Sequence, residues 1–225
     1  AEDFTSADIQ GLRICFRANS DIRLSAVFPC FPEEFVISYL RWEAVSMEDQ
    51  IDFLSYSDID NLVMSSNNPF NSLSIVLPYD YAKNKLCLNW KIISLGVEMK
   101  YFDKKVVIDF ASEQLLYESN QSLIYLICET DNIIDNTTLK HIQILADSAN
   151  DTKENAKNKL LYLVLSYLYD NRNRIEDFLC VVDIVYDDFG FPKIISKQID
   201  YLHNINDGNL YEAFSNMLNY TKDNL

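Results

Sequence analysis

The sequence predicts a mainly α protein, with a helical C-terminal region over residues 88–225 and a small mixed α+β N-terminal part over residues 1–87. Three observations support this fold class. Apolar residues recur at helical spacing through most of the second region, whereas short runs in the first region alternate apolar with polar residues. Capping residues and glycine or proline stops then divide the second region into separate helices. The two regions are expected either as separate units or as one continuous globule.

The first region contains candidates for both strands and helices. Residues 14–26 alternate around a polar turn and predict a hairpin, although Ile9, Leu12 and Phe16 also fit one face of a short helix. Pro32, followed by two glutamates, is typical of a helix start. A second helix is expected after Ser46, and a second strand pair over residues 73–77 and 86–90. The second helix should bury Ile51, Leu54, Ile59, Leu62 and Val63.

The second region shows clear helix boundaries. Asp103 and Asn136 are predicted N-caps of two helices, and Asp151 with Glu154 resembles a capping box that opens a third helix. That third helix carries an apolar run over residues 160–165, so we expect it to be central and the most buried. Residues 175–189 predict the next helix, which Gly190 would end. Two further helices are predicted over residues 194–202 and 210–220.

The charge balance limits the partners. With 34 acidic against 19 basic residues the net charge is −15, which disfavours nucleic acid as a direct ligand and anionic membranes, and favours a basic protein partner. The longest strongly apolar stretch, residues 160–169, is half a membrane span. Five scattered cysteines with no C-x-x-C pair indicate reduced thiols. Since the first residues lack the pattern of a secretory signal, we expect a cytoplasmic protein.

Few residues suit catalysis. The four isolated glycines leave no phosphate-binding loop and no nucleophile elbow. The two histidines, His141 and His203, do not supply a His-rich metal site, although either could partner a serine or cysteine through space. The densest acidic cluster is Asp183, Asp187 and Asp188. We interpret it as the solvated side of an amphipathic helix in preference to a metal or acid–base site, so no catalytic residue, cofactor or metal is predicted.

One stretch is typical of an interface with a protein. Between Arg41 and Lys83 the chain has no basic residue, while acidic and aromatic residues accumulate. Aromatic anchors supply affinity at interfaces, and charges steer the encounter. An ordinary polar surface over two helices and a loop would explain the composition equally well. The predicted partner-binding residues are Trp42, Glu43, Glu48, Asp49, Asp52, Tyr56, Asp58 and Asp60.

A family resemblance covers about residues 88–201. It is carried by Trp90, by Asp109-Phe110-Ala111 with Leu115, and by the run from Val185 to Pro192 with Tyr201 downstream. These motifs resemble a bacterial family catalogued as domain of unknown function 2247, although Gly190 and Lys193 stand where more acidic residues are expected.

Members of that family occur among immunity proteins of polymorphic toxin systems. The resemblance therefore implies an immunity protein that binds and neutralises a cognate toxin, with a basic nuclease domain as the expected target. A helical adaptor with another protein partner and a metal-dependent enzyme using the acidic cluster are the alternatives.

Overall fold

The computed structural model describes residues 53–118, 120–129, 133–205 and 209–225. Over these residues the protein is mainly α-helical, as the sequence predicts, and their only strand-like pairing is a parallel bridge between Leu54 and Ile175. The hairpin predicted over residues 14–26 and the helix predicted to begin at Pro32 lie outside the described residues.

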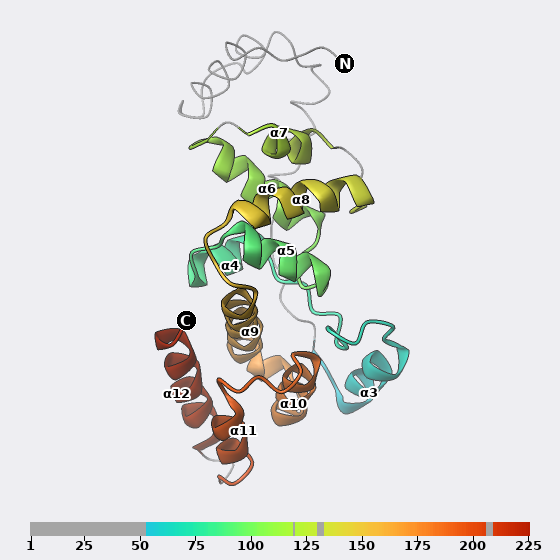
Figure 1. Cartoon of the computed structure of the whole chain (residues 1–225). Coiled ribbons are helices and arrows are strands. Elements are labelled where there is room, and N and C mark those ends of the chain that lie inside the picture. Colours follow the sequence, from blue (N-terminus) through green and yellow to red (C-terminus); the bar gives the residue numbers. More distant parts are fainter. Residues whose placement is uncertain (1–52, 119, 130–132, 206–208) are drawn as a thin grey trace, which may run out of the picture.

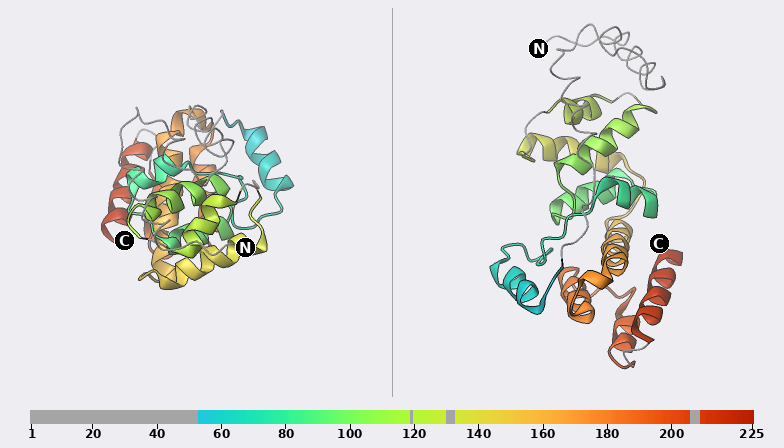
Figure 2. Two further views of the ribbon diagram at one scale, coloured as in Figure 1. Left: turned by 90° about the horizontal axis from the view of Figure 1, so that it is seen from above. Right: turned by 180° about the vertical axis from the view of Figure 1, so that it is seen from behind.

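The helices are arranged along one long direction. Helices α5 to α8 lie at one end and α10 to α12 at the other, with α9 running between them (Figures 1 and 2). A short 3₁₀ turn, Arg172–Arg174, joins α9 to α10. The bounds are α3 (Tyr56–Ser65), α4 (Tyr79–Lys85), α5 (Trp90–Glu98), α6 (Lys104–Leu115), α7 (Gln121–Cys128), α8 (Asn136–Ser148), α9 (Lys153–Asp170), α10 (Phe178–Asp188), α11 (Ser196–Leu202) and α12 (Leu210–Asp223).

Helix α9 is the centre of the fold, which confirms the prediction for the apolar run 160–165. Leu161 and Leu165 have no exposed surface, and the helix contacts α4, α5, α10 and α12. A helix that is apolar on every side is stable only when neighbours cover all of its faces. None of the described helices combines the length and the apolar character needed to cross a membrane.

The helix starts are partly as predicted. Asp103 caps α6, since its side chain accepts a hydrogen bond from the backbone N–H of Val106. The cap predicted at Asn136 is wrong by one residue, because Asp135 accepts from the N–H of Thr138. The capping box predicted at Asp151 is also wrong. Thr152 caps α9, which leaves the Asp151 carboxylate free to bind other groups.

The strand pair predicted over residues 73–77 and 86–90 is wrong. Leu73, Ile75 and Leu77 are buried, as their alternation implies. However, the backbone of Ile75 is bonded by the Asn71 side chain and not by a partner strand. The buried Asn71 amide donates to the carbonyls of Ile75 and Lys100, at 2.8 and 3.0 Å, and accepts from the N–H of Ile75. Alternating burial therefore reflects an irregular segment lying on the core, without a ladder.

The end of α10 explains much of the motif from Val185 to Pro192. Gly190 has a φ of 68°, and its N–H donates to the carbonyl of Asp187, while the N–H of Phe191 donates to the carbonyl of Tyr186. This pair of hydrogen bonds is a Schellman motif, and the Phe191 ring packs edge-on against Tyr186, as such motifs favour. Gly190 therefore stops the helix, as the sequence predicts.

Candidate partner-binding surface

Helix α3 buries little of itself. Ile59 is its one buried residue, and Leu62 is half-buried. Four apolar side chains around it are exposed to solvent: Phe53 (62%), Tyr56 (55%), Val63 (39%) and Met64 (88%). Val63 was expected to face inward, and that expectation is wrong. We call Phe53, Tyr56, Asp58, Asp60, Val63 and Met64 together the α3 surface. Contiguous exposed apolar groups with charges beside them are typical of interaction sites.

The backbone fixes α3 firmly despite this exposure. The Leu54 N–H donates to the carbonyl of Arg174 at 2.8 Å, and the Leu54 carbonyl accepts from the N–H of Glu176 at 3.0 Å. The Glu176 carboxylate accepts from the N–H of Tyr56 at 2.9 Å. Ser55 and Asp58 form a capping box at the first turn. The α3 surface is therefore held in a defined orientation beside the start of α10.

Acidic groups from two distant segments gather beside this surface. The pKa of Tyr56 is raised by a hydrogen bond to Asp177 and by the charge on that carboxylate. Burial raises the pKa of the Cys180 thiol, and the charges of Asp177, Asp183 and Asp60 raise it further. Asp60 on α3 and the aspartates of α10 thus act on one place. Carboxylates from both segments therefore lie near the Cys180 thiol.

A hollow of about 400 Å³ lies on one side of α3. Phe53, Leu54 and Leu62 form its apolar lining, while Asp58 and Asn61 contribute polar groups. Asp58 also has a structural task, because the Ser55 N–H and hydroxyl both donate to its carboxylate and lower its pKa. An apolar hollow with a carboxylate at its rim is suited to a lysine or arginine, whose stem is apolar and whose head is charged.

The predicted partner-binding residues fall into two groups. Tyr56, Asp58 and Asp60 lie together on α3 and are exposed. The other predicted residues, Trp42, Glu43, Glu48, Asp49 and Asp52, lie outside the described residues.

The far end of the same acidic stretch does not join the surface. Tyr79 is buried and donates to Glu113, and Tyr81 donates to Asp170. Asp80 forms an ion pair with Lys83. Burial is the main cause that raises the pKa of both tyrosines far above their usual range. These aromatic groups stabilise the fold and are not available to a partner. Tyr79, Asp80 and Tyr81 are therefore not part of the α3 surface.

The acidic cluster on α10 is divided among different tasks. Asp183 pairs with His203 at 2.9 Å. Asp188 was interpreted as solvated, and that is wrong: it is buried and accepts hydrogen bonds from the N–H and hydroxyl of Ser72 at 2.8 and 2.6 Å. Burial raises the pKa of Asp188, while these bonds oppose the rise. Within the described ranges, no three His, Cys, Asp or Glu side chains are grouped so as to hold a metal ion.

His141 has a serine partner through space. Its Nδ1 lies 3.1 Å from the Ser122 hydroxyl, and its ring stacks on Tyr125 with 4.1 Å between centroids. Ser122 is buried at the first turn of α7, so a substrate has no access to its hydroxyl. We interpret the pair as a contact that fastens α7 to α8, which pack together.

The structure defines an acidic, mainly α-helical protein whose helix α3 exposes apolar and acidic side chains. The chain belongs to the bacterial family described as "Uncharacterized protein conserved in bacteria (DUF2247)", whose model matches residues 79–222. This range includes the motifs that carry the resemblance, and it begins after α3. Neither the curated proteins nor the solved structures contain a significant match.

Proposed function

We propose that this protein is an immunity protein that binds a cognate bacterial toxin, a basic nuclease domain, and neutralises it through the α3 surface. One observation carries the proposal: a firmly anchored helix exposes four apolar side chains beside carboxylates from two segments. Nuclease domains need positive charge to hold their phosphate substrates, so an acidic surface can cover the same groups. The net charge of −15 supports fast association with such a partner.

The surface divides binding between two kinds of residue. Tyr56 and Met64 offer exposed apolar area as anchors, and truncation of an anchor mainly speeds dissociation. Asp60 is exposed and accepts no hydrogen bond from any other described residue, so it mainly steers association. Asp58 is unsuitable for this test because its carboxylate caps α3. The hollow beside Asp58 is expected to take a lysine or arginine of the toxin.

The test uses the full chain and the toxin domain encoded beside its gene. Association and dissociation rates are measured at low and moderate salt for the wild type and for Tyr56→Ala, Met64→Ala and Asp60→Asn. Each anchor variant should raise the dissociation rate by about tenfold. Asp60→Asn should slow association by about two- to threefold at low salt and change dissociation little. Growth of cells that express the toxin domain should be restored by the wild type.

Two matched controls lie on α8, far from α3. Leu139→Ala removes an exposed apolar side chain, and Asp147→Asn removes an exposed carboxylate. Both should leave the rates unchanged. If the toxin domain binds but the α3 variants behave like these controls, the contact surface lies elsewhere. If no complex forms and growth is not restored, the immunity function itself is wrong.

A further inference from the structure

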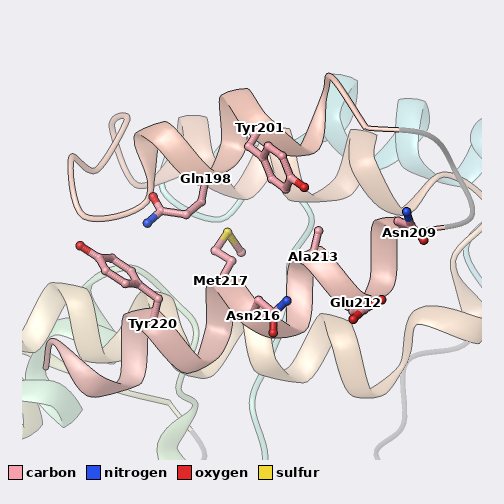
Figure 3. A pocket seen from close by; sticks show the side chains of 8 residues that line it. All are labelled: Gln198, Tyr201, Asn209, Glu212, Ala213, Asn216, Met217 and Tyr220. Atoms are coloured by element: carbon pink, nitrogen blue, oxygen red, sulfur yellow. The ribbon is translucent and has the colours of Figure 1, made fainter.

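A groove of about 390 Å³ lies between α11 and α12, at the other end of the molecule from α7. Gln198 and Tyr201 point from α11 toward α12, while Ala213 and Met217 point back from α12 (Figure 3). Met217 is buried and forms the floor. Ala213 is the smallest residue of the lining and contributes only a methyl group.

Helix α12, which forms one wall of the groove, packs against α9 with another face. Phe214 has no exposed surface and stacks on Tyr169 of α9, with 5.6 Å between ring centroids. Thr221 is buried on the same face, and Ile199 of α11 is buried too. α12 is therefore fixed to α9 by one face and presents the opposite face to the groove. A ligand would meet a preformed site, which reduces the ordering that binding requires.

The polar lining consists mainly of primary amides. Gln198, Asn209 and Asn216 line the groove, and their side chains form no hydrogen bond with any other described residue. By contrast, the amides of Asn204 and Asn224 are engaged by nearby backbone carbonyls. A primary amide offers both a donor and an acceptor, which is what each unit of an extended peptide backbone requires.

The remaining lining groups favour a basic side chain. Glu212 is the one charged residue among the groove's lining residues. Tyr201 and Tyr220 are exposed by 61% and 48%, and their rings can cover the apolar stem of a lysine or arginine or attract its charged head. Sites for small molecules are mostly apolar and enclose their ligand, whereas this groove has a mixed polar and apolar lining and lies at the surface.

We propose that the α11–α12 groove binds an extended peptide segment that carries a lysine or arginine, contributed by a partner protein. The amides of Gln198 and Asn216 pair with the peptide backbone. Glu212 binds the basic side chain, and Met217 with the two tyrosines supplies apolar contact. The inference is independent of the toxin-binding proposal, because the groove lies on different helices from the α3 surface.

The probe is a phage-displayed library of random peptides of about a dozen residues, selected on the full-length protein. Enriched peptides are synthesised with a fluorescent label, and their affinities are measured by polarisation. Ala213→Phe should fill the groove and Asn216→Ala should remove a backbone contact, each weakening binding by about tenfold or more. Glu212→Gln should reduce the preference for lysine over glutamine in the peptide. Asn219→Ala is the matched control, since Asn219 is an exposed asparagine on α12 that does not line the groove.

Circular dichroism and thermal melting confirm that each variant is folded. The expected result is a set of enriched peptides with a shared basic position, whose binding is lost in Ala213→Phe and kept in Asn219→Ala. The proposal is overturned if no peptide is enriched. It is equally overturned if the enriched peptides lack a basic residue, or if folded Ala213→Phe binds them with wild-type affinity. None of these results bears on whether a toxin binds at α3.

Discussion

Asp151 joins the two helices that form the middle of the fold, so its replacement by asparagine is an informative perturbation. The carboxylate accepts hydrogen bonds from Lys159 at 2.9 Å and from the amides of Asn89 and Asn155 at 2.8 Å each. It also accepts from the N–H of Thr152 at 2.8 Å. Asn89 caps α5 and Thr152 caps α9, so one side chain ties the starts of both helices together.

The pKa of Asp151 gives the size of the effect. Burial alone would raise it, but the hydrogen bonds from Lys159, Asn89 and Asn155 and from the Thr152 N–H outweigh burial and lower it from 3.8 to about 2. A shift of that size corresponds to about 2.4 kcal/mol of stability. Screening by water at the edge of the site reduces this, so we expect Asp151→Asn to cost about 1 to 2 kcal/mol at pH 7. The melting temperature should fall by about 3 to 8 °C.

The pH dependence of the stability tests whether the ionised Asp151 carboxylate is the cause of this stabilisation. Since the pKa is lower in the folded state than in the unfolded chain, the stabilisation is fully present above about pH 4 and is lost as the pH falls toward 2. Urea unfolding of the wild type and of Asp151→Asn is therefore compared from pH 7 down to pH 3. The difference in the free energy of unfolding between the two proteins should shrink as the pH falls from 4 to 3. Asp147→Asn, which removes an exposed carboxylate on α8, should change stability by less than about 0.5 kcal/mol. A difference at pH 7 no larger than that of Asp147→Asn, or one that is as large at pH 3 as at pH 7, would refute this account.

Further predictions concern the core and are checked by urea unfolding at pH 7. Gly96→Ala should cost about 1 to 3 kcal/mol, because a Cβ at residue 96 would lie 2.7 Å from Cε2 of the buried Phe102 ring and closer still to Cδ2. Gly190→Ala should cost about 1 to 2 kcal/mol through its φ of 68°. Gly190→Asn should cost less, because asparagine adopts a positive φ more readily than alanine does. Ser166→Ala should stabilise by about 1 kcal/mol, because the buried hydroxyl has no hydrogen-bond partner among the described residues; a loss of stability would contradict this. Leu165→Asp should abolish cooperative unfolding, and a cooperatively melting variant would show that α9 is not central.

The elements that the sequence predicts best are those whose pattern is local. The apolar run of α9 can satisfy its side chains only at the centre of a helical fold, and Gly190 stops α10 through its own backbone conformation. Helices α4, α5 and α7 were not predicted. Each is short, and α4 consists of two tyrosines, three charged residues, one alanine and one asparagine, with no clear apolar periodicity. The segment around Ile75 is predicted as a strand because apolar and polar residues alternate in it. This alternation indicates which side chains are buried, but it does not show which group bonds to the backbone, here the Asn71 side chain.

The candidate site shows the same division between local and distant information. Tyr56 and Asp60 could be selected from composition, since acidic and aromatic residues accumulate there without lysine or arginine. Glu176 and Asp177 could not be selected in this way, because they follow α9 in the sequence and only the fold brings them next to α3. Asp188 was misplaced for the same reason. Its position on α10 allows a solvated side chain, and only the contact with Ser72 shows that it is buried.

The run from Val185 to Pro192 is the most specific part of the family resemblance, yet three residues in its middle are engaged in the fold. Asp188 holds Ser72, Phe189 is buried against Tyr101, and Gly190 ends α10. Residues engaged in this way are unavailable to a partner. We therefore expect the run to stabilise the fold and not to bind a ligand. The α3 surface precedes the range that matches the family, whereas the α11–α12 groove lies inside it. A contact particular to one toxin is therefore expected at α3, and any ligand that family members bind in common is expected at the groove.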